Sequence, residues 1–256
     1  LRAGTSDPFV FVALANCEVS RAFMEPVLAE LQAKHRLKKS QVMVISSHTH
    51  SAPVLELTLS GMFELAGPDL ARVQQYSQLL RTRIVEAVAA ALDQPFPATL
   101  EYGVGRARFA MNRRVYQNDR INFGDNPDGP VDWDVPVLRV KGTNDAVRAI
   151  VFGYACHGTS ISGNDFYTVS GDYMAYARQH LETHYPDCTA VYFTGMGADS
   201  NPSPRGTLMD ARRHGLELAG AVVSVLDRPM RAINGELHFA FREVELPIMP
   251  NPPRQK

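Results

Sequence analysis

The chain has 256 residues, of which 45% are hydrophobic and 21% are charged, so its length and composition suit a globular domain with a sizeable core. Its 26 Lys and Arg residues and 27 Asp and Glu residues give a net charge of -1, without the basic excess typical of a nucleic-acid-binding domain. The longest apolar run is too short for a transmembrane helix. Three cysteines without a CxxC pair exclude a disulfide framework or a cysteine-rich zinc site.

The first half of the chain predicts a strand–helix–strand unit. Residues 9–15 (FVFVALA) form a β-branched and aromatic run typical of a buried strand, and residues 41–46 (QVMVIS) form a second. Ser20 is a candidate cap for a helix that reaches His35, although Pro26 leaves a later start open. This order of elements favours a parallel strand pair with a right-handed crossover.

The remainder of the chain continues to alternate between helical and strand patterns. We expect a helix at 68–92, a strand at 99–108, a long polar loop at 112–136, strands at 137–140 and 148–155, a helix at 172–184, a strand at 189–193, a helix at 207–226 and a strand at 236–245. The alternation predicts an α/β fold with a mixed, mostly parallel sheet, helices on both faces and an active site at the carboxyl ends of the strands.

Both ends of the chain predict a piece of something longer. The first residue is Leu1, without a recognisable leader before it, and residues 250–256 (PNPPRQK) look like a linker. We therefore expect residues 1–256 to form a single domain that is incomplete at both ends.

Three of the predicted strands end in polar turns rich in Gly and Ser. These turns are residues 47–53 (SHTHSAP), 156–160 (CHGTS) and 194–202 (TGMGADSNP). In open α/β sheets the ligand lies beyond the carboxyl ends of the strands, so we expect the three turns to converge on one pocket.

Histidines in two of these turns indicate a metal site. His48 and His50 are two residues apart, which directs both rings to the same side of an extended segment, and His157 supplies a third imidazole. Zinc is the natural choice for a histidine-rich catalytic site that leaves one position for water. The alternative is that strand-end histidines bind loop backbone, and the combination of an HxH pair with a third histidine favours the metal.

The same turns resemble motifs of the neutral/alkaline, non-lysosomal ceramidases. Residues 47–53 are similar to that family's THTHSGP turn, and residues 111–114 (MNRR) are similar to its NRS/NRR turn. Residues 156–173 contain CHGTSI and SGDY, which resemble its strand-end histidine segment and the helix start that follows. Residues 197–202 (GADSNP) resemble its GD-x-S-P turn. The four motifs occur in the family's order.

The resemblance implies a zinc-dependent hydrolase that cleaves the amide of ceramide into a fatty acid and a sphingoid base. By position it makes His48 and His157 zinc ligands and places His50 beside the metal, where it helps to position the substrate or the oxyanion. Arg113 would bind the substrate near the scissile group, a task that suits its fork of donors. Zinc would polarise the carbonyl or lower the pKa of a bound water.

The last of the four motifs departs from the family pattern. In the family a serine of the active site stands just before the proline, whereas this chain has Asn201 there and Ser200 one place earlier. Ser200 and Asn201 are therefore both candidate active-site residues, and the nucleophile is either a serine or water.

The zinc ligands that the family adds are a second departure. The family takes a Glu and a Tyr from a later part of the domain, and no stretch of this chain matches that part. The chain therefore resembles the N-terminal two-thirds of the catalytic domain. Local acids such as Asp165, Asp172 and Asp199 are candidates to assist in binding the metal.

Two other functions stay open. One is a metal-dependent hydrolase of another small amide or ester, and the other is a non-catalytic fragment that retains the fold. A ceramide site needs an apolar groove for two chains, which residues 54–59 with Met62 and Phe63 are candidates to line.

The expected partner is a lipid amide or another small-molecule substrate, and no nucleic acid is expected. Contact with a membrane surface stays open, and the sequence does not fix the oligomeric state. The resemblance also suggests a secreted or periplasmic protein.

Overall fold

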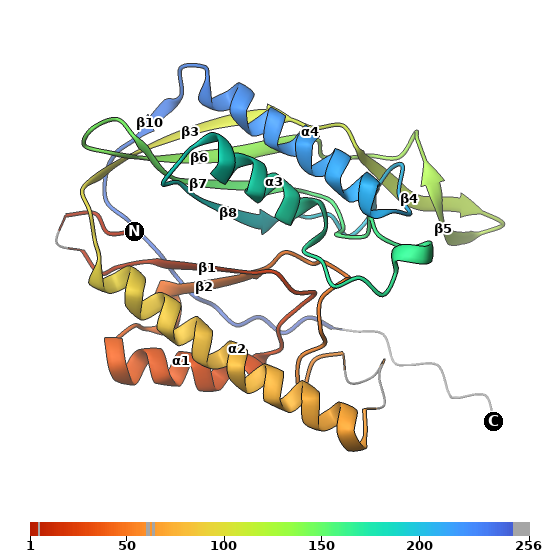
Figure 1. The fold of residues 1–256 in the computed structure, drawn as a ribbon, viewed down its shortest axis with the longest axis horizontal. Helices are drawn as coiled ribbons and strands as arrows, with labels where there is room; N and C mark the ends of the chain where they lie inside the picture. The colour runs from red at the N-terminus through yellow and green to blue at the C-terminus, as the bar shows by residue number, and fades with distance from the viewer. Residues whose placement is uncertain (5, 60–61, 63–64, 248–256) are drawn as a thin grey trace.

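A computed structural model describes residues 1–4, 6–59, 62 and 65–247. Its helices and strands form an α/β architecture in which helices lie on opposite sides of the strands (Figure 1). In chain order the helices and strands are β1 (Val10–Leu14), α1 (Arg21–His35), β2 (Val42–Ser46), α2 (Gly67–Asp93), β3 (Ala98–Arg106), β4 (Ala110–Gln117), β5 (Arg120–Asn126), β6 (Asp134–Gly142), β7 (Val147–Tyr154), α3 (Asp172–His184), β8 (Thr189–Thr194), β9 (Ser200–Pro202), α4 (Leu208–Leu226) and β10 (Arg231–Ile233).

The N-terminal region consists of the parallel pair β1–β2 and the helices α1 and α2. The Ser20 hydroxyl accepts a hydrogen bond from the backbone N–H of Phe23 at 3.1 Å, so α1 begins at Arg21 and Pro26 lies inside the helix. Phe23, Val27 and Leu31 on one face of α1 are buried against α2, which anchors the helix despite the proline. The predicted strand–helix–strand unit is confirmed.

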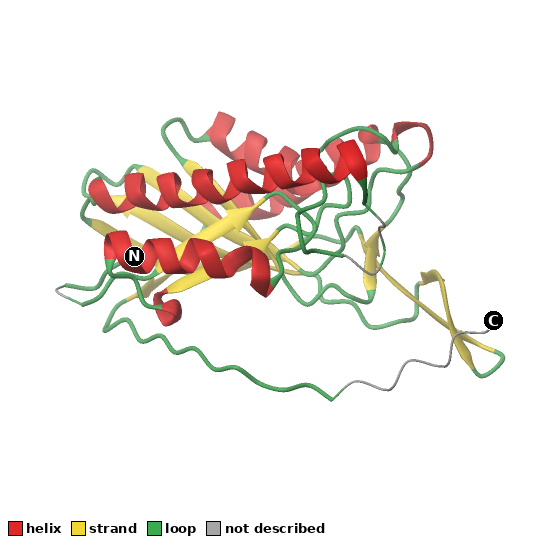
Figure 2. Cartoon of the chain, turned by 90° about the horizontal axis from the view of Figure 1, so that it is seen from below, coloured by secondary structure: helices red, strands yellow, loops and turns green. Residues whose placement is uncertain are grey.

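The second region is a five-stranded sheet in the order β10-β3-β6-β7-β8, covered by α3 and α4. Figure 2 shows the helices layered against the strands from a second direction. Thr207 caps α4 by accepting a hydrogen bond from the backbone N–H of Asp210 at 3.1 Å. The core of this region is built largely from α4, α3 and the inner face of the sheet.

The α/β class, the mixed sheets and the helices on both faces are confirmed, but fewer strands pair in parallel than the sequence predicted. Parallel ladders join β1 to β2 and β7 to β8, whereas the ladders of β3, β4 and β6 are antiparallel. The reason is that β6 and β7 are joined by a short turn, which permits only an antiparallel pair, while the β7–β8 connection contains α3.

Two predicted segments differ in the structure. The expected loop at 112–136 is instead mostly the hairpin β4–β5, which projects from one end of the molecule (Figures 1 and 2). Its polar sequence hid the strands because β5 is exposed along almost its whole length, so its apolar alternation is limited to Ile121 and Phe123. The expected strand at 236–245 is also wrong, since these residues form no strand and the chain pairs earlier, as β10.

Within the part of the chain that the structure describes, no helix has the length and apolar character needed to cross a membrane.

Candidate active site

The carboxyl ends of β2, β7 and β8 meet at one place, as the sequence predicted. The backbone of Thr49 forms a parallel bridge with Gly158, and the backbone N–H of His50 donates to the Gly158 carbonyl at 3.0 Å. The Thr194 hydroxyl at the end of β8 donates to the Ser47 carbonyl at 2.7 Å. The turns that follow the three strands are therefore held together by direct hydrogen bonds.

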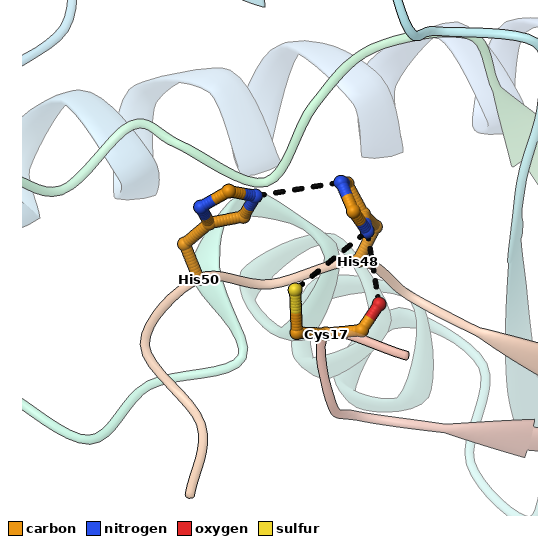
Figure 3. Close-up of side chains that lie close together, drawn as sticks. All are labelled: Cys17, His48 and His50. Atoms are coloured by element: carbon orange, nitrogen blue, oxygen red, sulfur yellow. Dashed lines mark hydrogen bonds between the residues drawn. The ribbon is translucent and has the colours of Figure 1, made fainter. Parts of the chain in front are cut away.

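His48 is fixed with one ring nitrogen facing the backbone and the other facing His50. Its backbone lies in the left-handed region with φ 61°, and its Nδ1 lies 2.9 Å from the Cys17 carbonyl oxygen. Because a carbonyl only accepts, Nδ1 carries the proton and Nε2 keeps a free lone pair. That Nε2 lies 3.4 Å from the Nε2 of His50 (Figure 3).

His157 is fixed in the same tautomer from the other side of the site. Its Nδ1 donates to the Gly197 carbonyl at 2.8 Å, and its backbone N–H donates to the Ser200 carbonyl at 3.0 Å. Its ring centroid lies 4.5 Å from that of His48 and 5.6 Å from that of His50. The structure therefore brings together the three histidines that the sequence singled out.

Arg113, on β4, reaches into this cluster of histidines. One of its Nη2 protons is donated to the Nε2 of His157 at 3.0 Å, and its Nη1 donates to the Asn201 amide oxygen at 3.1 Å. Two further contacts, of 2.8 and 3.1 Å, go to the Ala198 carbonyl. A cation bound at the Nε2 of His157 therefore requires the guanidinium to swing away from that nitrogen.

The two candidate residues of the β9 turn lie at different depths. Ser200 is 1% exposed, and its hydroxyl donates to the Asp199 carboxylate at 3.2 Å. The Asn201 amide oxygen accepts from both Arg113 and the Thr159 hydroxyl, each at 3.1 Å. Asn201 thus holds the guanidinium of Arg113 in place, whereas Ser200 faces its neighbour Asp199.

The environment keeps two of the imidazoles neutral. Loss of solvation, with His48 and Arg113 nearby, lowers the pKa of His50 to about 4. Desolvation also lowers the pKa of His157 to about 4, and the positive charge of Arg113 adds to the effect. Both rings therefore keep an unprotonated nitrogen at neutral pH, the form that binds a metal.

One residue of the site was missed in the sequence. Cys17 follows the end of β1 and lies beside His48, and donor atoms of Cys17, His48 and His50 all lie within 4.8 Å of one another. The predicted parallel pairing of the strands at 9–15 and 41–46 was the available signal, because parallel neighbours place the segments that follow them side by side, as the pairing of Leu14 with Ser46 does here. This arrangement of one thiol and two imidazoles is a candidate metal site.

The local acids lie outside that group of donors. Asp165 accepts a hydrogen bond from the first backbone N–H of α4, and Asp172 accepts from backbone N–H groups of α3 and the preceding loop. Asp199 accepts from Ser200. In the described residues none of the three carboxylates converges with the histidines.

A comparison with protein-family models gives a match over residues 2–197 to the N-terminal part of the neutral/alkaline non-lysosomal ceramidases. The chain belongs to this family. A comparison with curated proteins finds no match.

Two solved structures of ceramidases have the same fold as this family member. One is described as a ceramidase complexed with C2, with 20% sequence identity, a TM-score of 0.74 and 92% of this chain covered. The other is the neutral ceramidase from Pseudomonas aeruginosa, with 20% identity, a TM-score of 0.71 and 89% of this chain covered. This chain spans 38% of the length of each of these relatives.

The segment predicted to line an apolar groove divides between core and surface. Leu55 is buried in the hydrophobic core of the N-terminal region, whereas Leu57 is 60% exposed and Met62 is 73% exposed. Phe63 lies outside the described residues. The described apolar side chains of this segment therefore do not form one continuous apolar wall.

Proposed function

We propose that this chain carries the metal-dependent hydrolysis of an N-acyl amide, with an N-acyl sphingoid base of the ceramide type as its substrate. Membership of the ceramidase family supports the hydrolase class. The observation that carries the proposal is the meeting of three imidazoles and one guanidinium beyond the ends of three strands. Strand ends held together by backbone hydrogen bonds can keep such groups at fixed positions.

The donor set fits zinc. His48 and His157 each bond a backbone carbonyl through Nδ1, which leaves Nε2 as the ligand atom, an arrangement that protein zinc sites share. His50 presents its Nε2 to the same space. When bound there, zinc supplies a Lewis acid and lowers the pKa of a coordinated water.

The remaining groups handle charge on the substrate oxygen. Arg113 is held by Asn201 and the Ala198 carbonyl at the edge of the histidine cluster, where its donors can pair with the amide oxygen as negative charge develops. The neutral imidazole of His50 can accept a proton at the same place. Because Ser200 is buried and bonded to Asp199, we propose that water, rather than this serine, attacks the amide.

A second substrate class has its own support. The segment at 54–59 places Leu55 in the core, so it offers less apolar surface than two lipid chains need. A smaller amide or ester is therefore the second candidate. A panel of long-chain and short-chain N-acyl substrates separates the two: a rate that increases with chain length supports the lipid substrate, and one that does not supports the smaller one.

The decisive experiment compares His48→Ala with His184→Ala. His48 is central to the cluster, whereas His184 ends α3 on the exposed surface, so the second variant controls for the loss of any imidazole. We expect the purified protein and the control to bind about one zinc per chain, and His48→Ala to lose both the metal and amide hydrolysis. Equal zinc affinity in all three proteins would overturn the proposal.

A further inference from the structure

Cys17 occupies a position that the proposed function leaves without a role. Cys17 comes three residues after the end of β1. The strand that pairs with β1 in parallel is β2, and it ends two residues before His48. The backbone carbonyl of Cys17 already fixes the tautomer of His48 at 2.9 Å. Its side chain lies at the same place, with Sγ 3.8 Å from the Nδ1 of His48.

The thiol faces the histidine pair rather than the protein core. Figure 3 shows the sulfur of Cys17 beside the two rings, with its marked contact to the Nδ1 of His48, whereas the rings of His48 and His50 approach each other through their Nε2 atoms. One donor atom from each of the three residues lies within 4.8 Å of the others. Zinc binds thiolate at about 2.3 Å and imidazole at about 2.0 Å, so tetrahedral ligand atoms lie roughly 3.5 Å apart. To bind one ion, the three donors therefore have to close from within 4.8 Å to that spacing.

Charge points to the same conclusion. A zinc ion bound only by imidazoles would keep both of its positive charges, and Arg113, which donates to the Nε2 of His157, adds a third positive charge to this cluster. Asp165, Asp172 and Asp199 are engaged in hydrogen bonds elsewhere. In the described part of the chain, Cys17 is the side chain of the converging group that can become an anion.

We propose that the Cys17 thiolate is a ligand of the metal ion held by His48, an inference that rests on the proposed metal site. The S–H bond breaks, its proton leaves to solvent, and a sulfur–metal bond forms without any change in oxidation state. A thiolate ligand favours Zn²⁺ and Cd²⁺ over oxygen-preferring cations such as Mg²⁺.

Cobalt is the probe, because Co²⁺ occupies zinc sites and absorbs light according to its ligands. We titrate the full chain with Co²⁺ and compare wild type with Cys17→Ser and Cys188→Ser. Cys188 is the matched control: it lies in the core just before β8, at the opposite end of that strand from the site. Serine at position 17 retains the backbone carbonyl that orients His48.

We expect a near-ultraviolet thiolate-to-cobalt charge-transfer band in wild type and in Cys188→Ser, and its loss in Cys17→Ser. Zinc affinity should fall at least about tenfold in Cys17→Ser and stay unchanged in the control. Visible cobalt bands without a charge-transfer band in wild type would overturn the proposal, as would an unchanged band in Cys17→Ser.

The outcomes also separate this proposal from the one on which it rests. If metal is lost in His48→Ala but held equally well by Cys17→Ser and wild type, the metal site stands and Cys17 is not a ligand. If wild type binds neither cobalt nor zinc, both proposals fail.

Discussion

The region of β1, β2, α1 and α2 and the region of the five-stranded sheet have separate hydrophobic cores, and they contribute different chemistry to the site. The first core contains residues between Leu14 and Val88, and its region supplies the converging thiol and imidazoles of Cys17, His48 and His50. The second core contains residues between Ala107 and Leu226. Its region supplies His157 and the hydrogen-bonded pair of Arg113 and Asn201.

This difference shows that the site depends on the contact between the two regions. We call this contact, the backbone pairing of Thr49 with Gly158, the joint. Each region orients its own histidine, since His48 bonds the Cys17 carbonyl and His157 bonds the Gly197 carbonyl. The two histidines meet because the segments after β2 and β7 pair at Thr49 and Gly158. A change at this joint should disturb the site without touching any of its side chains.

The largest effect is expected from Gly158→Ala, which breaks the joint. A methyl group at this position would lie 2.7 Å from the His48 carbonyl oxygen and 2.8 Å from the Cα of Thr49, so the backbones of the two regions must separate. We expect a loss of about 3 kcal/mol in the free energy of unfolding, together with weaker zinc binding, measured by chemical denaturation and metal titration.

Gly220→Ala is the control for this substitution. Gly220 lies in α4, and a methyl group there meets nothing within 4 Å, so the change should increase stability by about 0.5–1 kcal/mol through helix propensity. Equal stability changes at the two positions would show that the joint is not tightly packed.

A smaller effect should appear in the pH dependence, which tests the second region. The pKa of His157 is about 4 in the folded protein against 6.5 in an unfolded chain, so the unfolded state binds more protons between these values. The free energy of unfolding is therefore highest above pH 6.5 and falls as the pH decreases toward 4. For His157 alone we expect a loss of about 2 kcal/mol between pH 7 and pH 5 in metal-free protein.

His157→Gln isolates this contribution. The variant should lose about half of the difference in stability between the two pH values, because glutamine does not titrate while His50, whose pKa is also lowered to about 4, keeps its own contribution. A pH dependence as steep in the variant as in wild type would assign the effect to other groups. Denaturation at both pH values with a chelator present provides the measurement.

The smallest effect is expected from a substitution of Arg113, the residue through which the second region places a positive charge at the site. Arg113→Met removes a cation and the donor that occupies the Nε2 of His157, so zinc should bind about tenfold more tightly while amide hydrolysis falls. Arg114→Met is the control, because its guanidinium also stacks on Phe123 and donates to the Ala198 carbonyl at 3.2 Å. Tighter zinc binding in both variants would indicate a general effect of charge.

The sequence predicted most of the elements that have a clear apolar pattern, such as the helices found at Arg21–His35 and Gly67–Asp93. The helix after Ser20 begins where this cap places it, the helix expected at 207–226 is Leu208–Leu226, and the three strand-end turns meet as expected. The hairpin β4–β5 was missed because β5 is largely exposed and β4 fully buries only Ala110 and Asn112, so no continuous buried face enforces apolar alternation along the hairpin. The prediction of a strand at 236–245 is wrong for the opposite reason. The sequence of these residues alternates between apolar and polar, but alternation alone does not supply a partner strand.

The roles assigned to single residues remain predictions, although their placement is now known. His48, His50, His157 and Arg113 lie together, and Asn201 holds the guanidinium. Ser200 lies at the same turn with its hydroxyl on Asp199. Sequence reasoning therefore located the site but did not distinguish a residue that faces it from one that points away.

By itself, the sequence determined which residues can perform chemistry, because the HxH pair, the later histidine and the family motifs are local patterns. Only the tertiary structure decided which of them meet. Cys17 lies far in sequence from His157 and carries no motif, and it enters the site because β1 pairs in parallel with β2 and the next segment binds Gly158. Such contacts depend on strand register and on the close approach of two backbones, which no local pattern encodes.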